Sequence, residues 1–134
     1  MDDKRTIITN TLLQQLTEWT DSLNKDGFYF CKRTWLTTQG ASVYIRSMVR
    51  GQLNNSPVLC LANIEIDEEH QNKGILKALI KHVIEHGHYF KEIEIENITS
   101  KRLLDYCIES GFEIKTASHI PDVYCHTVAK KTNP

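Results

Sequence analysis

The sequence has little of what marks a membrane protein, an exported protein or a disulfide scaffold. No apolar run approaches the roughly 18 residues needed to cross a bilayer, and the opening MDDKRTIITN holds no apolar signal core. The four cysteines stand far apart and form no C-x-x-C pair, so we expect reduced thiols. These absences predict a cytoplasmic protein without a membrane partner.

An excess of charge of one sign is missing as well. Sixteen Lys and Arg residues face 17 Asp and Glu residues, which gives a net charge of −1. Domains that bind nucleic acid usually carry a basic excess, so we expect no nucleic-acid partner. With 134 residues, 40% of them hydrophobic, and with no repeat or linker, the chain is predicted to form one globular domain over 1–134.

Two familiar glycine-rich phosphate patterns are also absent. The chain contains neither G-x-x-x-x-G-K-[ST] nor G-x-G-x-x-G. A P-loop NTPase and a Rossmann dehydrogenase are therefore excluded.

The apolar periodicity predicts a single-domain mixed α/β fold in the order α-β-β-β-α-β-α-β-β. Apolar steps of three and four predict helices over 6–23, 73–86 and 100–110. Alternating and β-branched stretches predict a hairpin over 28–50 and strands over 58–66, 92–96, 112–118 and 123–131. The strands on either side of helix 73–86 should run parallel through a right-handed crossover, while hairpins add antiparallel edges.

A polar turn stands directly before helix 73–86 and consists of Gln71, Asn72, Lys73 and Gly74. A helix start presents free backbone N–H groups and partial positive charge. Gly74 permits close backbone approach and Lys73 adds a full charge, so a phosphate or pyrophosphate is the expected ligand. A plain polar turn between a strand and a helix is the alternative interpretation.

Two segments resemble motifs of the GNAT superfamily of acyl-CoA N-acyltransferases. EIDEEHQNKGILKALIKHV is similar to motif A, whose pattern is Gln or Arg, two residues, Gly, one residue, then Gly or Ala. Gln71 to Ile75 match this pattern, whereas Leu76 replaces its small residue. ENITSKRLLDYCIESGFEI is similar to motif B, a strand end, a helix and a terminal GF. Motif A would span about 58–86 and motif B about 91–115.

The resemblance implies a GNAT-like fold with acetyl-CoA as co-substrate and no metal. It places the coenzyme pyrophosphate on the turn formed by Gln71, Asn72, Lys73, Gly74, Ile75 and Leu76. Because the two parallel strands splay apart in this family, backbone groups near Ile64 and Ile66 would contact the pantetheine arm. Asn97 and Ser100 are further candidates for coenzyme contacts, and Ser100 is equally well explained as a helix N-cap.

The implied reaction is direct attack of an amine on the acetyl thioester, which needs a base, a donor for the oxyanion and an acid. A backbone N–H near Ile66 could serve the oxyanion. We favour Glu65 as the base, because alternation places it opposite Ile64 and Ile66, close to the splayed edge. Glu94 and Glu96 on the neighbouring strand are its rivals.

The acid has two candidates that stand next to each other. Cys107 occupies the position where many family members have a tyrosine, and Tyr106, one place away, has the usual chemistry. One residue turns a helix by about 100°, so both cannot point into the site. Neither is required, because a coenzyme thiolate with a pKa of about 8.5 is a tolerable leaving group.

The histidines at 82, 86 and 88 invite a metal hypothesis, but nothing nearby completes a ligand set and we expect no metal. The acceptor is predicted to be an amine-bearing protein or small molecule, and the chain a monomer or homodimer. The competing hypothesis is a weakly active or inactive GNAT-like module that binds acyl-CoA or a protein. It is favoured by Leu76, Ser100 and Cys107, each of which replaces a residue common in the family.

Overall fold

The computed structural model describes residues 3–26, 32–50, 56–71, 74–86, 90–117 and 126–131. Its elements are α1 (Asp3–Asp26), β1 (Lys32–Thr38), β2 (Ala41–Arg50), β3 (Ser56–Ile66), the short 3-10 helix η1 (Glu68–His70), α2 (Ile75–His86), β4 (Glu92–Ile98), α3 (Lys101–Glu109), β5 (Glu113–Ala117) and β6 (His126–Lys131). The predicted order of helices and strands is confirmed. The sequence missed η1, and α1 is longer than the predicted 6–23. Residues 28–31, 118 and 123–125 of the predicted strands lie outside the described ranges.

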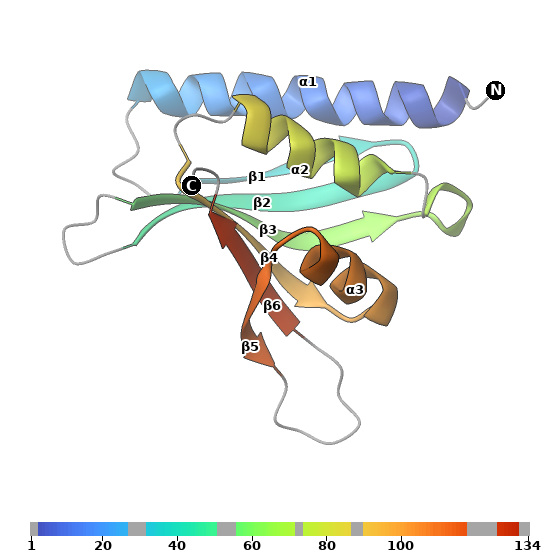
Figure 1. The fold of residues 1–134 in the computed structure, drawn as a ribbon. Coiled ribbons are helices and arrows are strands. Elements are labelled where there is room, and N and C mark those ends of the chain that lie inside the picture. The colour runs from blue at the N-terminus through green and yellow to red at the C-terminus, as the bar shows by residue number, and fades with distance from the viewer. Residues whose placement is uncertain are drawn as a thin grey trace.

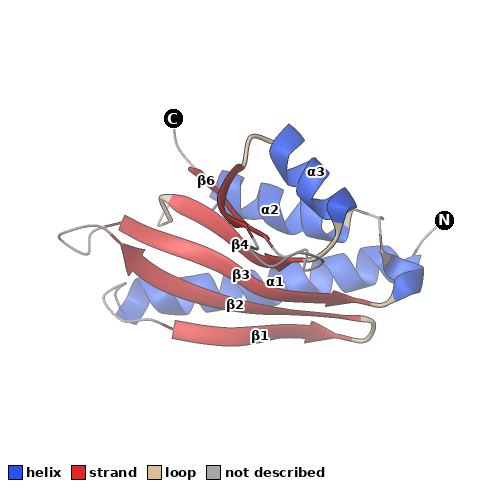
Figure 2. Cartoon of the chain, turned by 90° about the horizontal axis from the view of Figure 1, so that it is seen from below, coloured by secondary structure: helices blue, strands red, loops and turns tan. Residues whose placement is uncertain are grey.

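The strands form a six-stranded sheet in the order β1-β2-β3-β4-β6-β5. β3 and β4 are parallel, and the other neighbouring strands are antiparallel. The predicted mixed sheet is confirmed. α1 and α2 lie on one face of the sheet (Figure 1), and Figure 2 shows the other face of β1, β2 and β3 without a helix across it.

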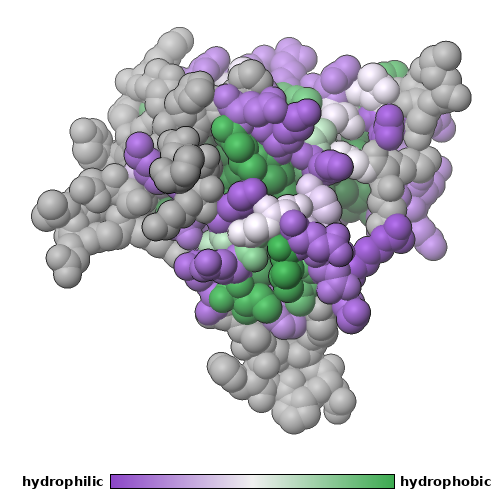
Figure 3. Space-filling view, in the orientation of Figure 1, coloured by the Kyte–Doolittle hydropathy of each residue, from purple (hydrophilic) through white to green (hydrophobic). Residues whose placement is uncertain are grey.

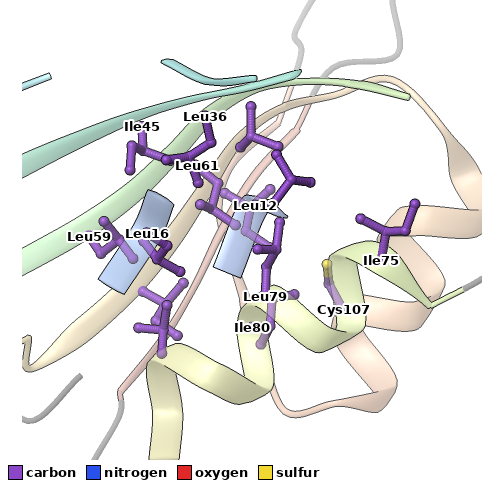
Figure 4. Packing of buried hydrophobic residues seen from close by; sticks show 14 of the residues in the cluster. Leu12, Leu16, Leu36, Ile45, Leu59, Leu61, Ile75, Leu79, Ile80 and Cys107 are labelled. Atoms are coloured by element: carbon purple, nitrogen blue, oxygen red, sulfur yellow. The ribbon is translucent and has the colours of Figure 1, made fainter. Parts of the chain in front are cut away.

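The core lies between the sheet and the two helices on this face. Leu12 and Leu16 of α1 and Leu59 and Leu61 of β3 are at most 1% exposed, and Figure 4 shows them gathered with α2 side chains. The apolar steps that predict this helix agree with its burial. Four of these side chains lie in the core, and two more are partly buried against it: Ile75, Leu79, Ile80 and Val83, then Leu76 and Ile84. Burial of these side chains is the main source of folding free energy. Within the described ranges, no helix is both long and apolar enough to cross a membrane.

β3 and β4 separate at their carboxyl ends. They pair only from Val58–Leu61 to Glu92–Ile95. The register of β3 against β2 then shifts at Ala62, and β4 is irregular against β6 between Ile95 and Ile98. Such bulges bend strands, and Figure 1 shows the two arrowheads pointing apart. We call the diverging segments, 62–66 of β3 and 96–98 of β4, the fork; the predicted splay is confirmed.

Candidate functional site

A cavity of about 560 Å³ lies between the fork, the start of α2 and α3. Figure 3 shows apolar surface among polar side chains in the middle of the view, in the region of α2 and α3 in Figure 1. The described lining residues are Ile64, Ile66, His70, Gln71, Gly74, Ile75, Leu76, Lys77, Glu96, Asn97, Thr99, Ser100, Arg102, Leu103 and Tyr106. The cavity thus brings together most of the residues singled out in motifs A and B. Asn72 and Lys73 lie outside the described ranges.

The β3 side of the cavity offers backbone groups. Asp67 N donates to Gly40 O at 2.8 Å, on the β2 side of the strand. Because backbone groups alternate along a strand, those of Ile66 and Ile64 face the gap left by β4. Ile66 O accepts from Gln71 Nε2 at 2.8 Å. An extended ligand could therefore pair with β3 at Ile64 and the Ile66 N–H.

The start of α2 favours an anion. Gly74 has φ of 84°, a conformation that suits glycine, and a Cβ built on it would meet nothing within 4 Å. The first turn of α2 contains no acidic residue. Lys77 and Arg102 line the same cavity. Partial positive charge of the helix start and two cationic side chains therefore act on one space that is open at Gly74.

The β4 side is held by Asn97 and by the cap of α3. Asn97 has φ of 58° and its Nδ2 donates to Ala62 O at 2.9 Å, across the fork. Ser100 Oγ accepts from Leu103 N at 3.3 Å, which confirms Ser100 as the N-cap of α3. Both residues also line the cavity. Their contact with a coenzyme stays a prediction.

The two neighbouring candidates for the acid separate onto two sides of α3. Tyr106 is partly buried and lines the cavity. Cys107 is fully buried, and Figure 4 places it beside α2 near Ile75 and Leu79. Burial raises the pKa of the Cys107 thiol to about 11. Since Cys107 belongs to the core, only Tyr106 of this pair is positioned to act in the cavity.

The carboxylates are distributed differently from our expectation. Glu96 is the only carboxylate among the described residues that line the cavity. Glu65 is exposed on the opposite face, where Asn63 Nδ2 lies 3.5 Å from its Oε1. Glu94 is 3% exposed and paired with Cys60 across the β3–β4 ladder. The structure therefore brings Glu96, rather than the favoured Glu65, to the cavity.

Glu96 forms an ion pair with Arg46, an arginine of β2 that was not among the sequence candidates. Arg46 Nη2 of β2 lies 2.5 Å from Glu96 Oε1 and 3.7 Å from Cys60 Sγ. The hydrogen bond to the Cys60 sulfur raises the pKa of Arg46, and burial raises that of Cys60 to about 12. Cys60, Glu94 and Glu96 have ligand atoms within 4.8 Å of one another. A neutral thiol and a guanidinium already bound to the cluster argue against a metal ion there.

The histidines predicted to bind no metal and five further lining residues remain to be placed. His82 Nε2 lies 3.1 Å from Thr17 Oγ1 and so joins α2 to α1, while the side chain of His86 and all of His88 lie outside the described part. Sequence reasoning missed five lining residues: His70, Lys77, Thr99, Arg102 and Leu103. Their nearness to Gln71, Gly74 and Ser100 in the chain was the only available signal. Arg46 gave no such signal in the sequence, because its partner Glu96 lies 50 residues away.

Comparison with solved structures identifies this architecture. Arabidopsis thaliana Naa50 in complex with the bisubstrate analogue CoA-Ac-MVNAL matches with a TM-score of 0.50 and 17% sequence identity, over 68% of this chain and 64% of that chain. The protein has a GNAT fold. The match spans less than two thirds of the length of the Arabidopsis protein.

Two further matches have weaker superpositions. An acetyltransferase from Thermus thermophilus has a TM-score of 0.49 at 10% identity, over 75% of this chain and 64% of that chain. Spermidine/spermine N-acetyltransferase SpeG from Vibrio cholerae has a TM-score of 0.49 at 16% identity, over 89% and 74%. No family profile and no curated protein sequence matches the chain.

Proposed function

We propose that the protein is an acyl-CoA-dependent N-acetyltransferase that moves an acetyl group from acetyl-CoA to a primary amine. The observation that carries this proposal is the cavity at the fork of a GNAT fold. It combines a helix start that favours an anion, strand backbone that faces a gap, the carboxylate of Glu96 and the phenol of Tyr106. We further propose that residues 1–134 act as one domain.

The residues of the cavity fit a coenzyme A molecule. Its phosphates would lie at Gly74 and the first turn of α2, with Lys77 and Arg102 at the same cavity. Its extended pantetheine arm, which carries amide groups, would pair with the backbone of Ile64 as a short extra strand. Ile66 O already accepts from Gln71 Nε2, so the N–H of Ile66 would be left for the acetyl end of the coenzyme. The cavity volume of about 560 Å³ is typical of small-molecule sites.

Acetyl-CoA supplies an acyl group on a good leaving group, and the protein's own side chains supply the proton transfers. The amine nitrogen forms a bond to the acetyl carbon while the carbon–sulfur bond breaks. Glu96 accepts the proton from the amine, and Tyr106 donates one to the departing sulfur. The Ile66 N–H faces the gap and would donate to the acetyl oxygen as that oxygen becomes negative.

The contact between Arg46 and Glu96 supports a route for the amine from the open face of the sheet. Arg46 reaches Glu96 from β2, on the sheet face that bears Tyr44 and Asn63. Glu96 thus lines the cavity and also contacts Arg46, whose side chain lies on the sheet face away from α1 and α2. Among the described residues, no helix crosses that face at β1, β2 and β3. The acceptor amine, on a protein or a small molecule, would approach through the fork from that face.

A thermal shift measurement tests coenzyme binding. Acetyl-CoA, coenzyme A and ATP are compared on the native chain, on Gly74→Asp and on Gly111→Asp. Gly111 also has positive φ, 96°, but lies outside the cavity lining, so it matches the backbone strain and the added charge. A ligand at a hundred times its dissociation constant stabilises the folded state by about 2.7 kcal/mol.

We expect acetyl-CoA and coenzyme A to raise the melting temperature of the native chain and of Gly111→Asp, and Gly74→Asp to lose this rise. Release of coenzyme thiol in the presence of a panel of amines then tests transfer. No shift with either coenzyme form would contradict the proposal. Binding without acceleration by any amine would favour the acyl-CoA-binding module instead.

A further inference from the structure

Glu96 stands at a point of β4 where regular strand pairing is interrupted. β4 is paired with β3 only as far as Ile95, and its register against β6 shifts between Ile95 and Ile98. Within the described residues, Glu96 therefore has no register partner in either neighbouring strand. The next residue, Asn97, has a φ of 58°. Because the sheet does not fix this part of β4, the direction of the Glu96 carboxylate depends on side-chain contacts.

Arg46 supplies such a contact from two strands away. Its register partner in β3 is Cys60, and the partner of Cys60 in β4 is Glu94. The side chain of Arg46 crosses β3 to Glu96, where its Nη2 lies 2.5 Å from Oε1. Two strand spacings of about 4.8 Å separate β2 from β4, so only a long side chain can make this contact.

Cys60 lies under the path of the Arg46 side chain. Arg46 Nη2 is 3.7 Å from Cys60 Sγ, and Cys60 is fully buried. Burial raises the pKa of the Cys60 thiol to about 12, although the hydrogen bond from Arg46 acts in the opposite direction. Cys60 therefore remains a neutral thiol, which packs beside the ion pair without adding a charge that would compete with Glu96 for Arg46.

The ion pair is in a poor place to stabilise the fold. The side chains of Arg46 and Glu96 are 34% and 25% exposed, so water screens their attraction, and such pairs usually contribute little to the free energy of unfolding. The buried Nε of Arg46 has no hydrogen-bond partner within the described residues, which lowers the net benefit further. The clearer effect of the contact is geometric, because it fixes one oxygen of a carboxylate that lines the cavity.

We propose that Arg46 is a positioning residue, which holds the carboxylate of Glu96 in the orientation from which it accepts the proton that leaves the amine nitrogen. This inference rests on the proposed function, in which Glu96 is the base. Arg46 is not among the residues that line the cavity, so it would act through Glu96 rather than on the coenzyme. A misplacement of about 1 Å in an active site can lower a rate by about a hundredfold.

A double-mutant cycle on the full chain tests the inference. Steady-state release of coenzyme thiol with an accepted amine is measured for the native chain, Arg46→Met, Glu96→Gln and the double variant. Arg46→Lys is added because it keeps a positive charge on a long side chain but loses the planar guanidinium. Arg33→Met is the matched control: Arg33 is the register partner of Arg46 in β1, is exposed and does not line the cavity. Melting temperatures with and without coenzyme A report folding and coenzyme binding of each variant.

We expect Arg46→Met to lower kcat by about tenfold to a hundredfold, with the KM for acetyl-CoA unchanged. Arg46→Lys should recover part of this loss, and Arg33→Met should have the native kcat. In the Glu96→Gln background, Arg46→Met should change kcat by less than about twofold, because the group on which Arg46 acts is already absent.

An unchanged kcat in Arg46→Met, or an equal loss in both backgrounds, would overturn the inference, because Arg46 would then not act through Glu96. A change confined to the KM for the amine would also overturn it, since Arg46 would then contact the acceptor. If Arg46→Met does not fold, Arg46→Lys takes its place in the cycle and must show the same dependence on Glu96. No transfer by the native chain to any amine would instead contradict the proposed function, and this inference with it.

Discussion

The two parts of the β3–β4 pair differ in what their residues do. In the paired part, Leu59, Leu61, Ile93 and Ile95 are at most 1% exposed. Here β3 and β4 each pair with a strand of the sheet on both sides. In the fork, Ile64 and Ile66 are only partly buried and Glu96 and Asn97 line a cavity. One ladder therefore contributes to the core at one end and lines the cavity of the proposed ligand site at the other.

The difference follows from a small departure in backbone pairing. The register of β3 shifts at Ala62, which bends the strand away from β4, and Asn97 adopts a positive φ at the corresponding point of β4. Residues in such conformations cost free energy and are found at functional sites. The cavity forms where the β3–β4 pairing is interrupted, so substitutions on either side of Ala62 should have different consequences.

The largest effect is expected on catalysis, from the carboxylate in the fork. Glu96→Gln keeps the size of the side chain and an oxygen that can accept from Arg46, but it cannot accept a proton from the amine. We expect acetyl transfer to fall by about 10²- to 10⁴-fold with little change in coenzyme affinity. The measurement is the steady-state rate of thiol release with an accepted amine.

Glu65→Gln is the matched control, because Glu65 lies on the adjacent strand but outside the cavity lining. Its rate should stay within about twofold of the native rate, as for most exposed substitutions. A large loss in Glu65→Gln with an active Glu96→Gln would restore Glu65, the base favoured by alternation alone.

The next effect separates stability from binding along β3. Leu61→Ala removes a side chain that is 1% exposed and should lower the free energy of unfolding by about 2–5 kcal/mol. Ile64→Ala removes a partly buried side chain that lines the cavity, so it should cost less stability and weaken coenzyme binding more. Urea denaturation and coenzyme titration of both variants check the contrast. Equal losses of stability would mean that the fork is packed like the paired part.

A smaller effect is expected at Asn97, which joins the two sides of the fork. Asn97→Ala loses the hydrogen bond to Ala62 O and leaves a Cβ residue at φ of 58°, which costs about 1–2 kcal/mol in conformation alone. Asn97→Gly loses the same bond but adopts this φ readily. Urea denaturation should therefore find the alanine variant less stable than the glycine variant. The reverse order would mean that backbone conformation does not limit this position.

The sequence predicted the elements and their order well because the apolar periodicity of α1, α2 and the strands is strong. It left two candidates for the proposed acid, Tyr106 and Cys107. An uncertainty of one residue in where the helix begins changes by about 100° which side chains face the cavity. It favoured Glu65 because alternation gives the face of a side chain but not its distance from a cavity formed by other elements. Arg46 and His70 depend on contacts with Glu96 and Gly40, which are distant in the chain, and no local pattern reports them.

The smallest effect concerns Cys107, which packs in the core behind Tyr106. Burial raises the pKa of this thiol to about 11, so the folded state favours the neutral form. The resulting stability is fully present below the ordinary thiol pKa of about 8.5–9 and is lost as the pH rises towards 11. At about pH 10 the loss should reach about 1.4–2 kcal/mol. Urea denaturation of the native chain and Cys107→Ala at about pH 8 and about pH 10, under reducing conditions, should show a shallower pH dependence for the variant. Cys60 and the other titrating groups are common to both proteins, so a difference between the two slopes belongs to Cys107. Equal slopes would mean that this thiol can ionise in place, on a side of α3 more open to water than its full burial indicates.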